Sequence, residues 1–124
     1  YSGTKVEFNS EELQIVNVNP DIWKIEGMED EDSYKIVALQ VQKEDRGNVG
    51  IVILGRGENQ EKVENWIKIG SKVKGIIGFA VGRTVFWQPL IEYKNGNMEK
   101  EKVIEIISNN FLHFYKIFVA NSYS

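Results

Sequence analysis

Two stretches of the same design constrain what this 124-residue chain can fold into. They are residues 50–59 (GIVILGRGEN) and residues 75–89 (GIIGFAVGRTVFWQP). Each begins with an apolar run suited to a buried strand, continues into a loop with glycine and arginine, and is followed by a helical pattern. Strands that alternate with helices are typical of a parallel sheet, which binds ligands at the carboxyl ends of its strands. We therefore expect an α/β fold that handles phosphate.

A third strand is predicted earlier in the chain, over residues 22–26 (IWKIE). Side chains alternate between the faces of a strand, so Trp23 and Ile25 share one face while Lys24 and Glu26 share the other. Two interpretations stay open. The strand is half exposed with its charged residues in water, or it is a barrel strand with its apolar pair against outer helices and its charged pair in a polar mouth.

Helical patterns and cap residues lie between and around these strands. The predicted helices are residues 10–16, with Asn9 and Ser10 as the cap, 29–43, 58–70, a short helix with Pro89 near its start, and 98–120. The loops after the second and third strands then cover residues 55–59 and 80–84. The aromatic residues of the last helix, with Phe86 and Trp87, are interpreted as packing residues, and His113 as structural or exposed.

Composition restricts the functional class. The chain has 42% hydrophobic residues, enough for the core of one domain, and a net charge of −3 with both signs mixed, which argues against nucleic acid as a partner. It contains no Cys and a single His, so thiolate metal sites and His clusters are excluded. No apolar run approaches the length of a membrane span, about 20 residues. We expect a cytoplasmic protein without a membrane partner, metal or cofactor. Because the chain begins with Tyr1, we also expect processing or a longer parent protein.

The two arginine loops suggest phosphate binding. A helix that begins directly after a glycine-rich strand end offers free backbone N–H groups and a positive dipole to an anion, and a guanidinium group adds paired donors. The alternative is a pair of tight turns with surface arginines. The predicted phosphate-binding residues are Gly55, Arg56, Gly57, Gly82, Arg83 and Thr84.

Lys24 is the candidate for covalent chemistry. In a closed pocket near guanidinium groups, burial and like charge would disfavour its ammonium form and leave an amine able to attack a carbonyl. Glu26, two residues later on the same face, could exchange protons with the resulting Schiff base. The alternative is a solvated lysine–glutamate pair.

Four segments of the chain resemble a known family. The segments DIWKIEG (21–27), VGIVILGRGE (49–58), IGFAVGRTVFWQPL (77–90) and KNGNMEKEKV (94–103) look like the C-terminal domain attached to bacterial 5-dehydro-2-deoxygluconokinases of myo-inositol catabolism. That domain is similar to class I TIM-barrel aldolases of the tagatose-bisphosphate type. The resemblance implies phosphorylated keto sugars as substrates, such as 2-deoxy-5-keto-gluconate 6-phosphate. It also implies a Schiff-base role for Lys24 on the sixth strand, with Arg56 and Arg83 after strands seven and eight.

The length of the chain departs from a complete barrel. A TIM barrel has eight strand–helix units in about 250 residues, whereas this chain supplies three. We therefore expect a single domain over residues 1–124 that forms the C-terminal part of a barrel: residues 1–19 as a lead-in and 20–120 as three units. Such a half-barrel needs an N-terminal half-barrel or a second copy of itself as partner. The alternatives to an aldolase-type lyase are a non-catalytic phosphosugar-binding module and an inactive structural fragment.

Overall fold

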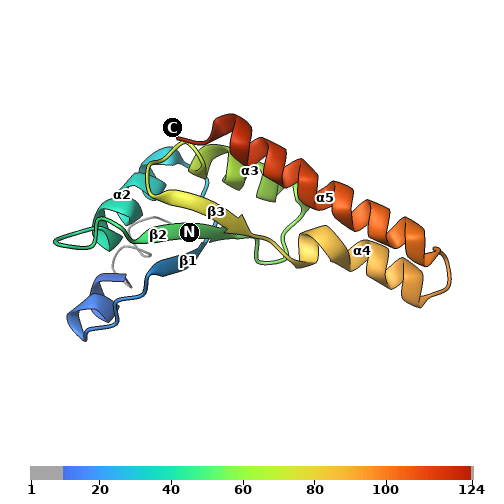
Figure 1. Ribbon diagram of the computed structural model, residues 1–124, viewed down its shortest axis with the longest axis horizontal. Helices are drawn as coiled ribbons and strands as arrows, with labels where there is room; N and C mark the ends of the chain where they lie inside the picture. The colour runs from blue at the N-terminus through green and yellow to red at the C-terminus, as the bar shows by residue number, and fades with distance from the viewer. Residues whose placement is uncertain (1–9, 124) are drawn as a thin grey trace.

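The structure, a computed structural model, describes residues 10–123 as a parallel sheet whose strands alternate with helices (Figure 1). Residues 10–15 are helical, as predicted for the lead-in, whereas the predicted cap at Asn9 lies outside the described residues. The further elements are β1 (Ile22–Glu26), α2 (Glu31–Val41), β2 (Gly50–Leu54), α3 (Gln60–Gly70), β3 (Ile76–Ala80), α4 (Arg83–Lys94) and α5 (Lys100–Asn121).

The three strands pair in the order β1-β2-β3, and both pairings are parallel. Lys24 lies beside Val52, and Glu26 beside Leu54. A shift in register between β2 and β3 falls at Ile51 and Val52. Because all strands run the same way, the loops that leave β1, β2 and β3 lie at the same end of the sheet. The predicted α/β class and the three strand–helix units are confirmed.

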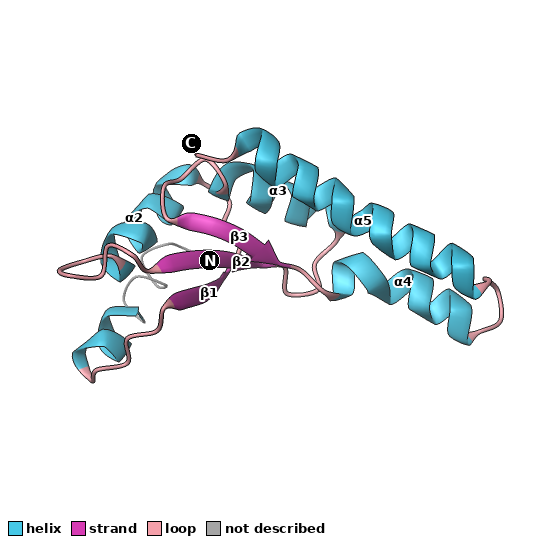
Figure 2. Ribbon diagram, in the orientation of Figure 1, coloured by secondary structure: helices cyan, strands magenta, loops and turns pink. Residues whose placement is uncertain are grey.

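Among residues 10–123, helices cover one face of the sheet and leave the other open. Figure 2 shows α2, α3 and α5 on one side of the three strands. Ile25, Ile51 and Ile53 point to that side and are at most 6% exposed, and Trp23 packs against the same core. On the opposite face Ile22 and Ile77 are 53% and 57% exposed. The predicted alternation along β1 is therefore present, with the apolar pair on the helix side.

One buried hydroxyl on α2 joins the loop after β1 to the interior of α3. The Tyr34 side chain is fully buried, and its oxygen accepts from the Met28 N–H at 2.8 Å and donates to the Trp66 carbonyl at 3.1 Å. Burial raises the pKa of Tyr34 above its ordinary value, so the hydroxyl stays a hydrogen-bond donor even in moderately alkaline solution. The Trp66 ring lies so close to Gly27 that a Cβ there would meet it at 2.1 Å. These contacts fix the turn after β1.

Aromatic residues of α5 pack on the last strand, as predicted. The ring of Phe79 on β3 lies 5.6 Å from that of Phe111, 6.5 Å from that of Phe114 and 6.0 Å from that of Phe118. The other side of α5 stays uncovered, because Ile104, Tyr115 and Val119 are all at least half exposed.

The helix after β3 begins earlier than the sequence predicts. It starts at Arg83, so Arg83 and Thr84 are helical and Pro89 lies in its interior, not near its start. Proline has no amide hydrogen, and the carbonyl four residues before it loses its helical donor. Here that carbonyl belongs to Val85, and the Asn110 side-chain amide on α5 donates to it at 2.9 Å. A contact from another helix thus replaces the missing bond and allows α4 to continue past the proline.

This replacement predicts coupling between two substitutions. Asn110→Ala should lower the free energy of unfolding by about 1 kcal/mol, because the Val85 carbonyl then lacks a donor. In a Pro89→Ala background the helix supplies its own N–H, so the same change should cost less by about 0.5 kcal/mol or more. Urea unfolding of the four proteins measures this difference. Strictly additive effects would show that Asn110 does not compensate for the proline.

Candidate functional site

A hollow lined mostly by polar residues lies where the loops after β2 and β3 meet, at the carboxyl ends of these strands. Its volume is about 460 Å³. It is bordered by the first residues of α3 and of α4, so two helix N-termini face it. The lining residues are Gly57, Glu58, Asn59, Gln60, Arg83, Thr84, Trp87 and Gln88. The hollow contains both predicted arginine loops in part, and this makes it the candidate site.

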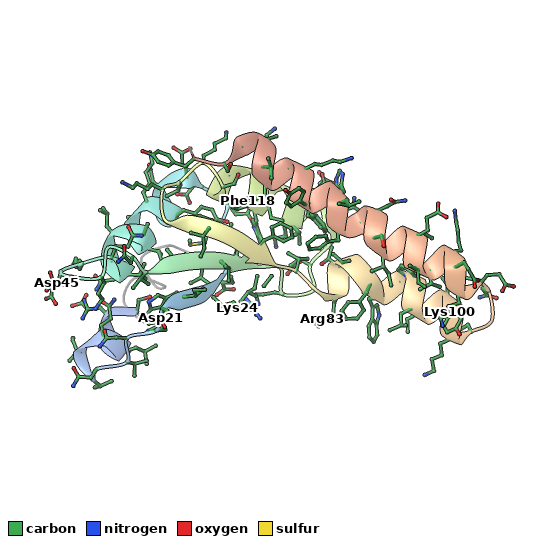
Figure 3. All side chains as sticks on the ribbon, viewed as in Figure 1. Asp21, Lys24, Asp45, Arg83, Lys100 and Phe118 are labelled. Atoms are coloured by element: carbon green, nitrogen blue, oxygen red, sulfur yellow. The ribbon has the colours of Figure 1, made fainter. Side chains whose placement is uncertain are left out.

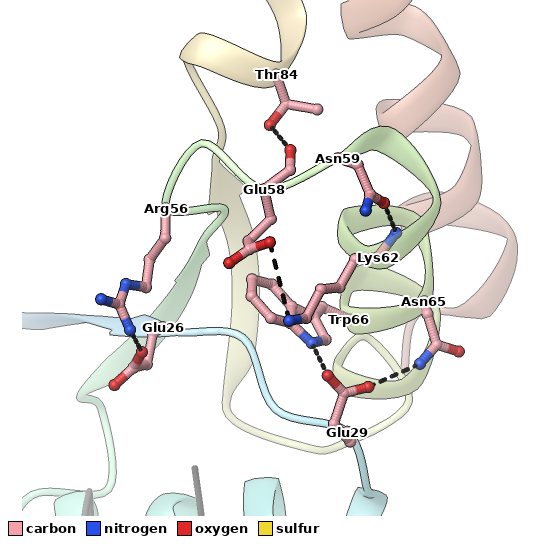
Figure 4. A network of polar contacts seen from close by, with 9 residues as sticks. All are labelled: Glu26, Glu29, Arg56, Glu58, Asn59, Lys62, Asn65, Trp66 and Thr84. Atoms are coloured by element: carbon pink, nitrogen blue, oxygen red, sulfur yellow. Dashed lines mark hydrogen bonds and ion pairs between the residues drawn. The ribbon is translucent and has the colours of Figure 1, made fainter.

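Direct contacts hold the two loops together. The Arg83 guanidinium lies against the backbone of Gly57, where a Cβ would be only 2.6 Å from its central carbon. The Thr84 hydroxyl donates to the Glu58 carbonyl at 2.6 Å, a bond drawn in Figure 4. Gly57 has a φ of +72°, a conformation that favours glycine. The absence of a side chain at Gly57 therefore allows both the positive φ of the turn and the close approach of the Arg83 guanidinium.

The two helix starts present backbone donors to the hollow. In α3 the Asn59 side chain caps the helix by accepting from the Lys62 N–H at 2.8 Å. In α4 the Gly82 carbonyl accepts from the third and fourth amides of the helix, and no side chain caps it. The first amides of a helix have no intrahelical acceptor, so those of Gln60, Arg83 and Thr84 remain available. Such amides, with the positive end of the helix dipole, suit an anion.

The charges around the hollow leave one guanidinium group unneutralised. Within residues 10–123, Arg83 forms no ion pair with a carboxylate. Glu58 also lines the hollow, but Figure 4 shows its carboxylate turned toward Lys62, 3.8 Å away on the next turn of α3. The side of the hollow formed by α4 is therefore positive.

The other predicted site residues lie outside the hollow. Arg56 has a φ of +56° and points to the end of β1, where it forms an ion pair with Glu26. In this pair, drawn in Figure 4, the predicted phosphate ligand Arg56 and the predicted proton-exchanging group Glu26 bind each other. Lys24, labelled in Figure 3, is exposed on the open face of the sheet. Gly55 and Gly82 shape the two loops, since a Cβ at Gly55 would crowd two valine side chains.

Sequence reasoning missed five residues that line the hollow: Glu58, Asn59, Gln60, Trp87 and Gln88. The interpretation of Trp87 as a packing residue was wrong, because it is 53% exposed. With α4 starting at Arg83, Trp87 and Gln88 fall one turn after Arg83 and Thr84 and thus on the same side of the helix. The four-residue spacing would have identified them had the helix start been recognised.

Outside the hollow, a groove between α3 and α5 contains the one histidine. His113 is exposed, as predicted, and hydrogen bonds to Glu64. Over residues 10–123 no three carboxylate or imidazole groups gather as a ligand set for a metal. In the same range, no helix combines the length and the apolar character that a membrane crossing needs.

Fold and site together define an α/β protein with an anion-suited hollow at the carboxyl ends of parallel strands. The chain belongs to the family DUF2090, described as an uncharacterized protein conserved in bacteria, which matches residues 7–121. Neither the curated proteins nor the solved structures contain a match to this chain. The function must therefore be argued from the site.

The fit of Arg83 on Gly57 predicts the effect of a single methyl group. Gly57→Ala should lower the free energy of unfolding by about 1–2 kcal/mol, because an alanine there is strained and displaces the guanidinium. Gly47 is a matched control, since a Cβ there meets nothing within 4 Å. Gly47→Ala should change the stability by less than about 0.5 kcal/mol. Equal losses in urea unfolding would contradict this account of the loop.

Proposed function

We propose that this chain is the phosphate-binding part of a class I aldolase-like lyase that acts on a phosphorylated keto sugar, such as 2-deoxy-5-keto-gluconate 6-phosphate. The observation that carries the proposal is the Arg83 guanidinium, which has no carboxylate partner within residues 10–123 and lies between two helix N-termini in one hollow. A phosphate group needs these elements: oriented backbone donors, a positive dipole and a planar pair of charged donors. The sugar and the carbon–carbon chemistry come from the family resemblance.

The arrangement of elements supports a barrel. Three parallel strands with helices on one face would form the C-terminal part of a TIM barrel if further units covered the open face. In TIM barrels a common phosphate site uses the loops after strands seven and eight and the N-terminus of an extra helix. In this chain α4 is an additional helix between β3 and α5, and its N-terminus borders the hollow. The loops after β2 and β3 would then be those of strands seven and eight.

The exposed apolar surface supports a partner. Ile22 and Ile77 on the open sheet face, and Ile104 and Val119 on α5, are each at least half exposed. β1 and β3 each have an unpaired edge within residues 10–123. An N-terminal half-barrel, or a second copy of this half, would cover these surfaces, and its enclosure would desolvate the region around Lys24.

In the proposed reaction the neutral Lys24 amine attacks the ketone carbon of the substrate. Loss of water from the carbinolamine gives an iminium ion. The bond between the α and β carbons then breaks, its electron pair moves to the iminium to form an enamine, and the β-carbon with its hydroxyl leaves as an aldehyde. Glu26 would accept the proton of the substrate hydroxyl during cleavage. Its present partner Arg56 lies on the loop after β2, so substrate phosphate and Glu26 would compete for that guanidinium. The imine serves as electron sink.

A second candidate is a phosphosugar-binding module without catalysis. The exposed position of Lys24 and the engagement of Glu26 with Arg56 favour it, since neither group is arranged for proton transfer in this chain. Under this alternative the hollow keeps its ligand and Lys24 does no chemistry.

The phosphate role of Arg83 predicts a loss of binding. Arg83→Ala should weaken binding of a phosphorylated ketose by about 10- to 100-fold, which corresponds to roughly 1.5–3 kcal/mol for a hydrogen bond to a charged group. Arg46→Ala is the control, because Arg46 lies outside the hollow and bonds to Asn19 and the Lys43 carbonyl. Isothermal titration calorimetry measures both. Equal affinities of the two variants would exclude Arg83 as the phosphate ligand.

The two candidates differ in a trapping experiment. The experiment is borohydride reduction in the presence of a phosphorylated ketose, with the units that complete the barrel present. The sugar should become attached to Lys24 in the native chain, and the control variant Lys24→Arg should form no adduct. Peptide mass spectrometry locates the label. Ketose binding without any adduct at Lys24 would support the binding module and reject the lyase.

A further inference from the structure

We infer that Trp87, with the side-chain amides of Gln60 and Gln88, binds the carbon chain of an open-chain polyol phosphate whose phosphate lies at Arg83. This inference rests on the proposed phosphate role of the hollow. It adds the groups that select the rest of the ligand and names its chemical class.

Trp87 is the most exposed of the three tryptophans. Trp66 is 5% exposed and Trp23 is partly buried against the core, whereas Trp87 is 53% exposed. Its indole borders the hollow one helical turn after Arg83, which separates their Cβ atoms by about 5–6 Å. A large flat apolar surface at this distance from a phosphate is placed to contact the C–H groups of a ligand chain that extends from Arg83 along α4.

Two amides flank the same wall in matched arrangements. Gln60 donates to Glu64 at 3.1 Å, and Gln88 donates to Glu92 at 3.0 Å, each across one helical turn. These bonds orient the amides, and among the described residues neither amide oxygen accepts a hydrogen bond. Each amide retains a free acceptor and a further N–H, the combination that a hydroxyl group uses.

Size and polarity favour a polyol over a nucleotide. The hollow of about 460 Å³ lies in the lower part of the range for small-molecule sites, roughly 300–1,000 Å³. Its lining contains one aromatic ring, and the other lining residues except Gly57 have polar or charged side chains. A base would need a second apolar wall, which the lining does not contain. In a chain of hydroxyl-bearing carbons, the C–H groups can pack on the single aromatic ring while the hydroxyl groups bond to the polar lining residues.

The test compares three probes by calorimetry: inorganic phosphate, 6-phosphogluconate as an open-chain polyol phosphate, and AMP. The native chain should bind 6-phosphogluconate about tenfold more tightly than inorganic phosphate, and AMP no better than inorganic phosphate. Trp87→Ala should remove most of this preference and leave the affinity for inorganic phosphate unchanged, whereas Trp87→Phe should keep part of it. Tyr93→Ala is the matched control, because Tyr93 is an exposed aromatic on α4 outside the hollow.

The outcomes separate this inference from the proposed function. An unchanged preference in Trp87→Ala, while Arg83→Ala still weakens both phosphate ligands, would overturn the role of Trp87 and leave the phosphate site intact. Tighter binding of AMP than of 6-phosphogluconate would overturn the choice of a polyol. If the native chain binds no phosphate compound, the phosphate site itself is refuted, and this inference is refuted with it.

Discussion

Parallel pairing of three strands is the constraint on which the rest of the structure depends. It brings the carboxyl ends of β1, β2 and β3 to the same end of the sheet, although the three loops are far apart in the sequence. Each strand is followed by a helix, so the N-termini of these helices lie at this end of the sheet as well. The meeting of Gly57, Arg83 and Thr84 in one hollow is a consequence of this topology and needs no long-range sequence motif.

Local patterns predicted most of the fold because apolar periodicity, glycine and cap residues act over short distances. Asp30 and Asn59 cap α2 and α3 with side-chain bonds, and the strand limits agree with prediction to within a residue or so. The start of α4 could not be predicted in this way. Gly82 provides no side-chain cap, and where the helix passes through Pro89 the missing donor comes from Asn110, 25 residues from Val85.

The candidate site was predictable in its backbone and less so in its side chains. Glycine and arginine in the two loops located it, but nothing local distinguishes Arg83, which faces the hollow, from Arg56, which pairs with Glu26. The difference arises from strand order, since β1 lies next to β2 and offers its carboxylate to that loop alone. Lys24 illustrates the same limit: its position on the strand was predictable, whereas the closed pocket expected around it is not formed by the described residues, which leave it exposed.

The central claim is that the first amides of α3 and α4, with Arg83, form an anion site. A titration of the ¹⁵N-labelled chain with inorganic phosphate, followed by amide chemical shifts, tests it most directly. We predict that the amide signals of Gln60, Arg83 and Thr84 move together with one dissociation constant. Shifts concentrated instead at Lys68 and Lys116 in the groove between α3 and α5, or no shifts at the two helix starts, would contradict the account.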